Sequence, residues 1–139
     1  MKKTTVFLFL FLLPTLYAQN LVGRWSINSL IGSATASEVY VLLPTKAQGY
    51  EYGTLLFLQP DGSFNCHRVP GCGQDRFPPS SYGKYTVIDD YYIHFFVEKT
   101  SGEREVLVNE DLGNYYYYRQ DGGFRFLKSS GDLDRDRQE

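Results

Sequence analysis

Turn signals recur at short, regular intervals through most of the sequence, and this spacing limits the fold more than any other feature. Pro, Gly, Asp, Asn and Ser gather at 60–62, 89–90, 101–102, 112–114 and 121–123, and the last four sites are about ten residues apart. The runs between them are rich in Val, Ile, Tyr and Phe and show almost no helical period. Neighbouring runs should therefore pair as antiparallel strands joined by hairpins.

These runs predict eight or nine strands. Seven lie at 52–59, 63–69, 83–88, 91–98, 103–110, 115–119 and 124–128, and two more precede them at 21–28 and 38–43. So many short strands must hide their edges, and closing the sheet on itself does so. We expect an all-β fold, a small antiparallel up-and-down β-barrel of about eight strands. A β-sandwich is the alternative.

Alternation along each run predicts which side chains face the inside of the barrel. The opposite faces are also partly apolar, so a second layer or a partner should cover part of the outside. The expected inner pairs are Leu55 with Phe57, Tyr85 with Val87, Ile93 with Phe95, and Phe124 with Phe126.

The first 18 residues have the order of a secretory signal peptide. Lys2 and Lys3 precede the apolar run Val6–Leu13, Pro14 breaks the run, and Ala18 offers a small residue for cleavage. The run is too short to span a membrane, and no second long apolar stretch follows it. We expect a signal peptide at 1–18, a β-barrel domain at 19–128 and a disordered polar tail at 129–139. The mature chain should be secreted or periplasmic, with no membrane span.

Charge and motifs argue against several functional classes. Without the leader the chain has 12 basic and 16 acidic residues, which disfavours nucleic acid as a partner. Only His67 and His94 could act as a general base, and no Gly-x-Ser-x-Gly elbow supplies a nucleophile. The paired carboxylates at 89–90 and 110–111 fall in expected turns. We predict that the protein is not an enzyme, needs no cofactor and holds no metal.

Cys66 and Cys72 enclose a short loop that contains Pro and Gly. In an oxidising compartment such a pair should form a disulfide. The bridge would tether a Pro- and Gly-rich loop at 69–81 and would not build the fold. A metal site from Cys66, His67, Cys72 and His94 is the alternative, but no Cys-x-x-Cys or His-x-x-x-His spacing supports it.

Three motifs follow one another along the chain. Gly23-Arg24-Trp25 opens the first mature strand, FLQPDGSF occupies 57–64, and GKYTV occupies 83–87. In this order they resemble the short lipocalin-like proteins that bacteria export. The resemblance covers about 21–127 and implies a barrel whose closed end is plugged by Trp25. Arg125 of the last strand would stack across the indole, a favourable cation–π contact, with Arg119 or Lys128 as substitutes. The alternative is that Trp25 is an ordinary core residue and Arg125 is solvated.

Tyrosine is the most prominent residue type, with runs at 91–92 and 115–118 and two more residues at 50 and 52. Its apolar ring and hydroxyl suit ligand cavities and protein interfaces alike. By the resemblance we expect an exported protein that binds a small apolar or amphipathic ligand. The alternative is an interaction module, such as an inhibitor or immunity-type partner of another exported protein, that presents the Tyr-rich surface or the Cys72 loop. The expected ligand-binding residues are Tyr85, His94, Phe95, Tyr117 and Phe126.

Overall fold

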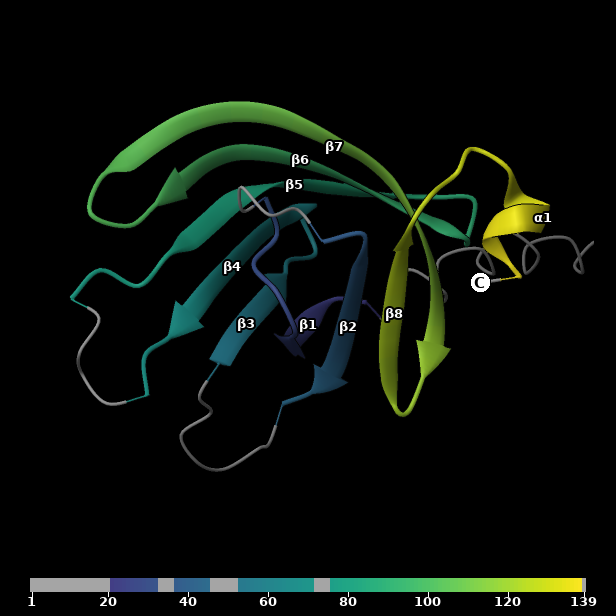
Figure 1. Ribbon diagram of the computed structural model, residues 1–139, viewed down its shortest axis with the longest axis horizontal. Coiled ribbons are helices and arrows are strands. Elements are labelled where there is room, and N and C mark those ends of the chain that lie inside the picture. The colour runs from purple at the N-terminus through teal and green to yellow at the C-terminus, as the bar shows by residue number, and fades with distance from the viewer. Residues whose placement is uncertain (1–20, 33–36, 46–52, 72–75, 139) are drawn as a thin grey trace, which may run out of the picture.

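Eight strands close into one antiparallel barrel in the computed structural model, which describes residues 21–32, 37–45, 53–71 and 76–138 (Figure 1). The predicted fold class is confirmed. The expected leader at 1–18 lies outside the described residues. The elements are β1 (Gly23–Ile27), β2 (Val39–Pro44), β3 (Gly53–Leu58), β4 (Ser63–Val69), β5 (Ser80–Ile88), β6 (Tyr92–Ser101), β7 (Glu105–Gln120), β8 (Gly123–Lys128) and the short helix α1 (Leu133–Asp136).

The strands follow the order β1-β2-β8-β7-β6-β5-β4-β3 around the barrel. From β3 to β8 each strand pairs with the next along the chain, as the hairpin spacing predicts. The start differs from a simple up-and-down order, because β1 pairs with both β2 and β3 while β2 pairs with β8. Asn28 supports this arrangement. Its side chain donates to the Val39 carbonyl (3.1 Å) and accepts from the Val41 N–H (2.9 Å).

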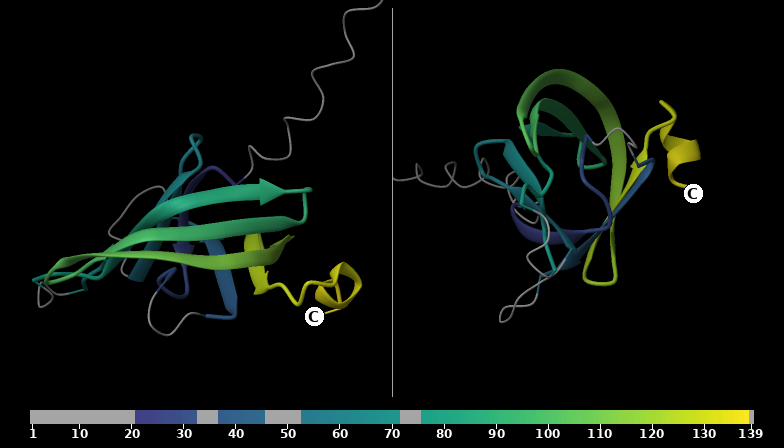
Figure 2. Two further views of the ribbon diagram at one scale, coloured as in Figure 1. Left: turned by 90° about the horizontal axis from the view of Figure 1, so that it is seen from above. Right: turned by 60° about the vertical axis from the view of Figure 1, so that its left-hand side comes forward.

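β7 is one long strand where the sequence predicts two. The expected turn at 112–114 is a bulge instead, because Gly113 takes a left-handed conformation (φ 73°) within the strand. The Gly113 N–H donates to the Asp111 carboxylate at 2.7 Å and so stabilises the bulge. A second register shift lies beside Asn109 (φ 46°). β7 therefore bends without reversing direction and stays beside β6 along its length (Figure 2).

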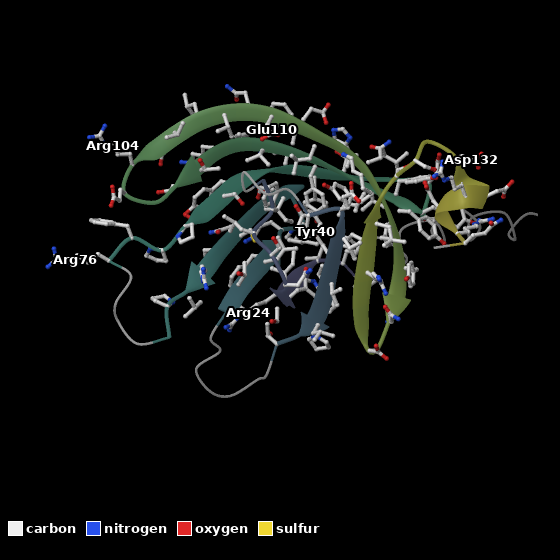
Figure 3. The ribbon with its side chains drawn as sticks, viewed as in Figure 1. Arg24, Tyr40, Arg76, Arg104, Glu110 and Asp132 are labelled. Carbon is white, nitrogen blue, oxygen red and sulfur yellow. The ribbon has the colours of Figure 1, made fainter. Side chains whose placement is uncertain are left out.

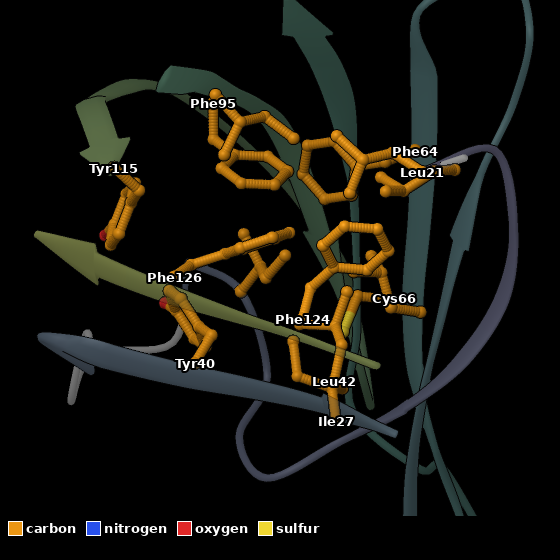
Figure 4. Close-up of a cluster of buried hydrophobic side chains, with 14 of the residues drawn as sticks. Leu21, Ile27, Tyr40, Leu42, Phe64, Cys66, Phe95, Tyr115, Phe124 and Phe126 are labelled. Atoms are coloured by element: carbon orange, nitrogen blue, oxygen red, sulfur yellow. The ribbon is translucent and has the colours of Figure 1, made fainter. Parts of the chain in front are cut away.

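The core lies inside the barrel and is rich in aromatic side chains (Figure 4). The prediction of inner residues is right for β6 and β8, whose expected pairs are buried, and the β5 pair packs against the core half-buried. In β3 the alternation has the opposite phase: Leu56 and Leu58 join the core cluster, and Phe57 stacks on His67, with ring centroids 5.5 Å apart. The expected inner residue Leu55 is buried, but outside that cluster. Residues 55–58 are all apolar, so no polar side chain in the sequence sets the phase of the alternation.

Candidate functional site

Four of the five expected ligand-binding residues face the barrel interior, and two of them, Phe95 and Phe126, are fully buried. Phe95 and Phe126 have no exposed surface, and their ring centroids lie 6.0 Å apart. Tyr85 and Tyr117 are half-buried against the core, and burial, together with a nearby carboxylate, raises the pKa of each hydroxyl. A ring without exposed surface borders no space that could admit water. Side chains therefore fill this part of the interior.

The fifth expected residue, His94, lies on the outer face of the barrel. Its neighbours Ile93 and Phe95 point inward, so the pleat of β6 turns His94 outward. Its Nδ1 lies 2.8 Å from the Asn114 side-chain oxygen, and its Nε2 lies 3.1 Å from a carboxylate oxygen of Asp111. Both ring nitrogens are therefore engaged with β7. His94 joins two strands and cannot contact a ligand held among the other four residues.

Trp25 does not contact the cation that the resemblance implies. Trp25 packs edge-on against Phe124 (ring centroids 5.3 Å apart) and donates from Nε1 to the Leu21 carbonyl at 2.8 Å. Arg125 lies between two inward-pointing residues of β8, Phe124 and Phe126, so its side chain leaves the opposite face. The expected stack of Arg125 on Trp25 is not formed, because the two side chains lie on opposite sides of the barrel wall.

The two substitute cations lie over other rings. The Arg119 guanidinium is 5.2 Å from the centroid of Phe124. Lys128 Nζ is 4.9 Å from the centroid of Tyr115 and also donates to the Leu112 carbonyl. Gly23, the other residue expected to have a structural role, opens β1 with a φ of 143° that favours glycine. Gly23 therefore has a conformational role at the start of β1, whereas the expected contact between Arg125 and Trp25 is not formed.

The expected disulfide is not found. Cys66 of β4 is a free thiol whose side chain points into the core with no exposed surface (Figure 4). Alternation along β4 explains this placement, because Phe64 and Cys66 share the inner face. Cys72 lies outside the described residues. Burial raises the pKa of the Cys66 thiol to about 12, so the folded barrel holds it as an unreactive thiol.

This placement predicts that Cys66 does not react while the barrel is folded. In a Cys72→Ser variant, Ellman's reagent at pH 8 should detect no thiol in the folded protein and one thiol per chain in guanidinium chloride. The same assay on the denatured wild-type chain should detect two thiols. Rapid reaction in the folded variant would contradict the inward placement of Cys66. Absence of any thiol in the denatured wild type would show that Cys66 and Cys72 form the disulfide expected from the sequence.

The C-terminal segment, which the sequence predicts to be disordered, is docked on the start of β6. Asp136 of α1 is buried and accepts hydrogen bonds from Tyr92 Oη (3.1 Å), Ser129 Oγ (2.7 Å), and Ser130 Oγ and N–H (2.6 and 2.8 Å). Burial alone would raise the pKa of Asp136, but these donors outweigh it and hold the pKa at about 2. The Asp136 carboxylate therefore holds the C-terminal segment in place. The docked segment covers part of the Tyr-rich surface.

Acid should release this segment from β6. The pKa of Asp136 is lower in the folded chain than its ordinary value, so its contribution to docking is present above about pH 4 and is lost as the pH falls toward 2. In an NMR titration, the Ser130 amide should shift with a midpoint near pH 2. Asp136→Asn should displace that amide signal at neutral pH, whereas Asp134→Asn, on the exposed side, should not. A Ser130 midpoint near pH 4 would contradict this account.

Two hydroxyls inside the barrel form no hydrogen bond of regular geometry among the described residues. They belong to Tyr40 and Ser81, and neither side chain has exposed surface. Figure 3 shows Tyr40 in the middle of the barrel, and its ring lies 5.4 Å from that of Tyr115. Burial raises the pKa of both tyrosines, and Ser81 lies opposite Cys66 in the β4–β5 register. Unsatisfied buried hydroxyls are costly, and Ser81 is the clearer case, because the Tyr40 hydroxyl interacts with that of Tyr115.

The N-terminal half of β7 has a free edge. The β7–β8 register runs from Tyr115 to Gln120, and the Asn114 carbonyl also accepts from the Ser129 N–H (3.0 Å). Among the described residues, 105–113 therefore pair with β6 alone. Three successive apolar side chains there are exposed: Val106 (51%), Leu107 (73%) and Val108 (37%). Backbone N–H and C=O groups on an unpaired edge, flanked by apolar side chains, are what strand addition by a partner uses. We call residues 105–108 the open edge.

Exposed apolar residues gather at this end of the barrel. Phe77 is 57% exposed and lies three residues before β5. The first residue of β5 is paired with Ser101 at the end of β6, and Ser101 is paired with Glu105 at the start of β7. Figure 3 shows Arg76 and Arg104 at this same end of the molecule. Phe77 and the open edge are therefore exposed at the same end of the molecule, with β5 and β6 between them.

Sequence reasoning predicts a strand at 103–110 but misses its open edge. One signal was present: the run Val106-Leu107-Val108 is continuous and is flanked by polar residues, whereas a strand with one buried face should alternate. The positions at which β8 stops pairing with β7 depend on the closure of the whole barrel. No local pattern encodes them.

No protein-family model matches the chain, and neither a curated protein nor a solved structure is similar enough to it to match. The resemblance to lipocalin-like proteins therefore stays a prediction. Among the described residues, no helix is long and apolar enough to cross a membrane. The same part of the chain brings together no group of three His, Cys, Asp or Glu side chains that could hold a metal ion.

Proposed function

We propose that this chain is an exported protein-binding module that receives an extended segment of a partner along the open edge of β7. The observation that carries the proposal is that no strand of the described chain lies beside this edge, which exposes three apolar side chains in succession. A partner strand would gain backbone hydrogen bonds from the edge and apolar contacts from Val106, Leu107 and Val108.

The close packing around Phe95 and Phe126 supports the same proposal. Phe95 and Phe126 have no exposed surface, so a ligand between them would have to displace packed rings. A partner at the open edge displaces nothing in the described chain. The proposed interaction surface is therefore not the Tyr-rich surface expected from the sequence. Part of that surface is occupied by the docked C-terminal segment, through the contact of Tyr92 with Asp136.

Selection from a random-peptide library tests the proposal. Peptides enriched on the wild-type protein are compared on Val106→Pro and Leu107→Pro. Successive N–H groups of an antiparallel strand point to opposite edges, so one of these prolines removes a free donor and the other breaks a bond to β6. We expect at least about ten-fold weaker binding to the variant whose thermal stability is unchanged. Leu43→Ala, at an exposed apolar site on β2, is the control and should bind normally.

Two outcomes would overturn the proposal. One is equal binding of the selected peptides to the wild type and to both folded proline variants, which would place the binding site elsewhere. The other is loss of binding in Leu43→Ala to the same extent as in the proline variants, which would show a nonspecific response to surface change.

A second candidate function is binding of a small amphipathic molecule inside the barrel. The observation that favours it is that the buried hydroxyls of Tyr40 and Ser81 form no hydrogen bond of regular geometry among the described residues, so each could donate to a ligand carbonyl or carboxyl group. Because neither side chain has exposed surface, such a ligand would have to displace packed side chains. Mass spectrometry of native protein before and after organic extraction tests this idea. A stoichiometric compound bound by the wild type and lost in Tyr40→Phe would support it, and an empty protein would count against it.

A further inference from the structure

We infer that the segment added at the open edge is basic. This inference rests on the proposed strand addition and names the chemistry of the partner. It depends on the charges along the β6–β7 hairpin, on which cations there are already engaged, and on how far regular pairing can extend.

The hairpin concentrates the negative charge of the protein. Residues 98–111 contain five acidic and two basic residues, whereas the whole chain has a formal net charge of only −2. The acidic residues are Glu98, Glu103, Glu105, Glu110 and Asp111, and the basic residues are Lys99 and Arg104. Without the expected leader, the rest of the chain has 10 basic and 11 acidic residues and is close to neutral. The negative field is therefore a local property of the hairpin that carries the open edge.

The two cations leave most of this charge uncompensated. Lys99 Nζ lies 3.2 Å from a Glu105 carboxylate oxygen and 5.2 Å from the centroid of Tyr82, so it is engaged within the hairpin. Arg104 lies at the hairpin tip, while Glu110 lies farther along β7 (Figure 3). Among the described residues no cation forms an ion pair with Glu103 or Glu110. Basic side chains of a partner could approach both carboxylates from solvent.

The same charges disfavour a second copy of this chain as the occupant. Antiparallel pairing of two open edges across a twofold axis would bring two hairpins together, each with an excess of three negative charges. Like charges on facing strands are destabilising. A basic segment from a different protein meets the same edge with complementary charge. The open edge should therefore leave this protein monomeric at neutral pH.

The length of the contact is set by the bulge beside Asn109. Its φ of 46° breaks the regular strand conformation, so regular pairing is confined to Glu105–Val108. Along this stretch Val106 and Val108 share one face, while Glu105 and Leu107 share the other. A complementary segment therefore alternates apolar residues, opposite the valines, with Lys or Arg on the face that carries Glu105.

Three synthetic peptides of equal length test the inference, one alternating Lys with Val, one Gln with Val and one Glu with Val. Each is titrated into the full-length protein by NMR at low and at physiological salt. We expect the Lys peptide to bind about ten-fold more tightly than the Gln peptide, with amide shifts centred on 105–108, and to weaken as salt is added. The Glu peptide should bind least. In the double variant Glu105→Gln/Glu110→Gln the preference for the Lys peptide should fall. The control Glu38→Gln, at an exposed site just before β2, should retain that preference.

The outcomes separate this inference from the proposal beneath it. If all three peptides shift the 105–108 amides with equal affinity, the basic partner is wrong and strand addition stands. If none of them shifts these amides, strand addition is wrong as well. If light scattering finds a dimer at neutral pH that Leu107→Pro or Val106→Pro dissolves, the occupant is a second copy and the inference is overturned.

Discussion

Replacing Phe95 with alanine should lower the free energy of unfolding by about 3–5 kcal/mol, the range observed when a buried aromatic ring is removed from a well-packed core. Phe95 has no exposed surface and contacts four other aromatic rings, with centroid distances of 5.4 to 6.5 Å. Urea denaturation followed by the fluorescence of Trp25 measures the change. A loss of this size would leave a domain of ordinary stability close to unfolding.

Phe77→Ala provides the matched control, because Phe77 is exposed and its removal should change stability by no more than about 0.5 kcal/mol. If Phe95→Ala costs as little as Phe77→Ala, the ring of Phe95 borders empty space. The barrel would then be open inside, and ligand binding would become the stronger candidate function.

Gly123→Ala should prevent normal closure of the barrel. A Cβ atom at Gly123 would overlap the backbone carbonyl of Leu42 in the facing strand β2. Backbone atoms cannot move aside as the end of a flexible side chain can, so β2 and β8 must separate locally. We expect a loss of about 3 kcal/mol in the free energy of unfolding, at the upper end for overpacking.

Gly102→Ala is the control for that substitution, since a Cβ at Gly102 would meet no atom within 4 Å. Thermal unfolding of the two variants, followed by circular dichroism, makes the comparison. Equal melting temperatures would mean that β2 does not lie against β8 as described, and the closed order of strands would have to be revised.

Local turn chemistry explains why most strands could be predicted from sequence. The run 63–69 coincides with β4, and the run 124–128 lacks only the first residue of β8. In both cases Gly and Asp fix the preceding turn. The prediction fails where such residues have another use. Gly113 forms a bulge within β7 and not a turn, and the local sequence does not distinguish these two uses of a left-handed glycine.

Features that depend on closure of the sheet could not be predicted. The pairing of β1 with β3 and of β2 with β8 joins segments that are not neighbours in a meander. The phase of β3 is equally nonlocal: its four apolar residues fit either face, and the pairing of Leu56 with both Trp25 and Cys66 fixes the inner one. The docked C-terminal segment depends on Tyr92, which is 44 residues from Asp136 in the chain.

The candidate site shows the same division. The expected cavity residues are largely core residues, because alternation identifies inward-facing side chains but cannot say whether the space between them is filled. The open edge was visible as an unalternating apolar run at 106–108. Within the described ranges this edge lacks a neighbouring strand because β8 ends its pairing with β7 at the Tyr115–Lys128 pair.

Amide hydrogen exchange along β7 tests the central claim most directly. NMR of the protein alone should show protected amides through Tyr115–Tyr118, where β7 has strands on both sides. Within 105–108, the amides that point away from β6 should exchange rapidly and become protected when the Lys-Val peptide is added. Slow exchange of those amides in the protein alone would mean that the edge is already paired, and it would contradict the account.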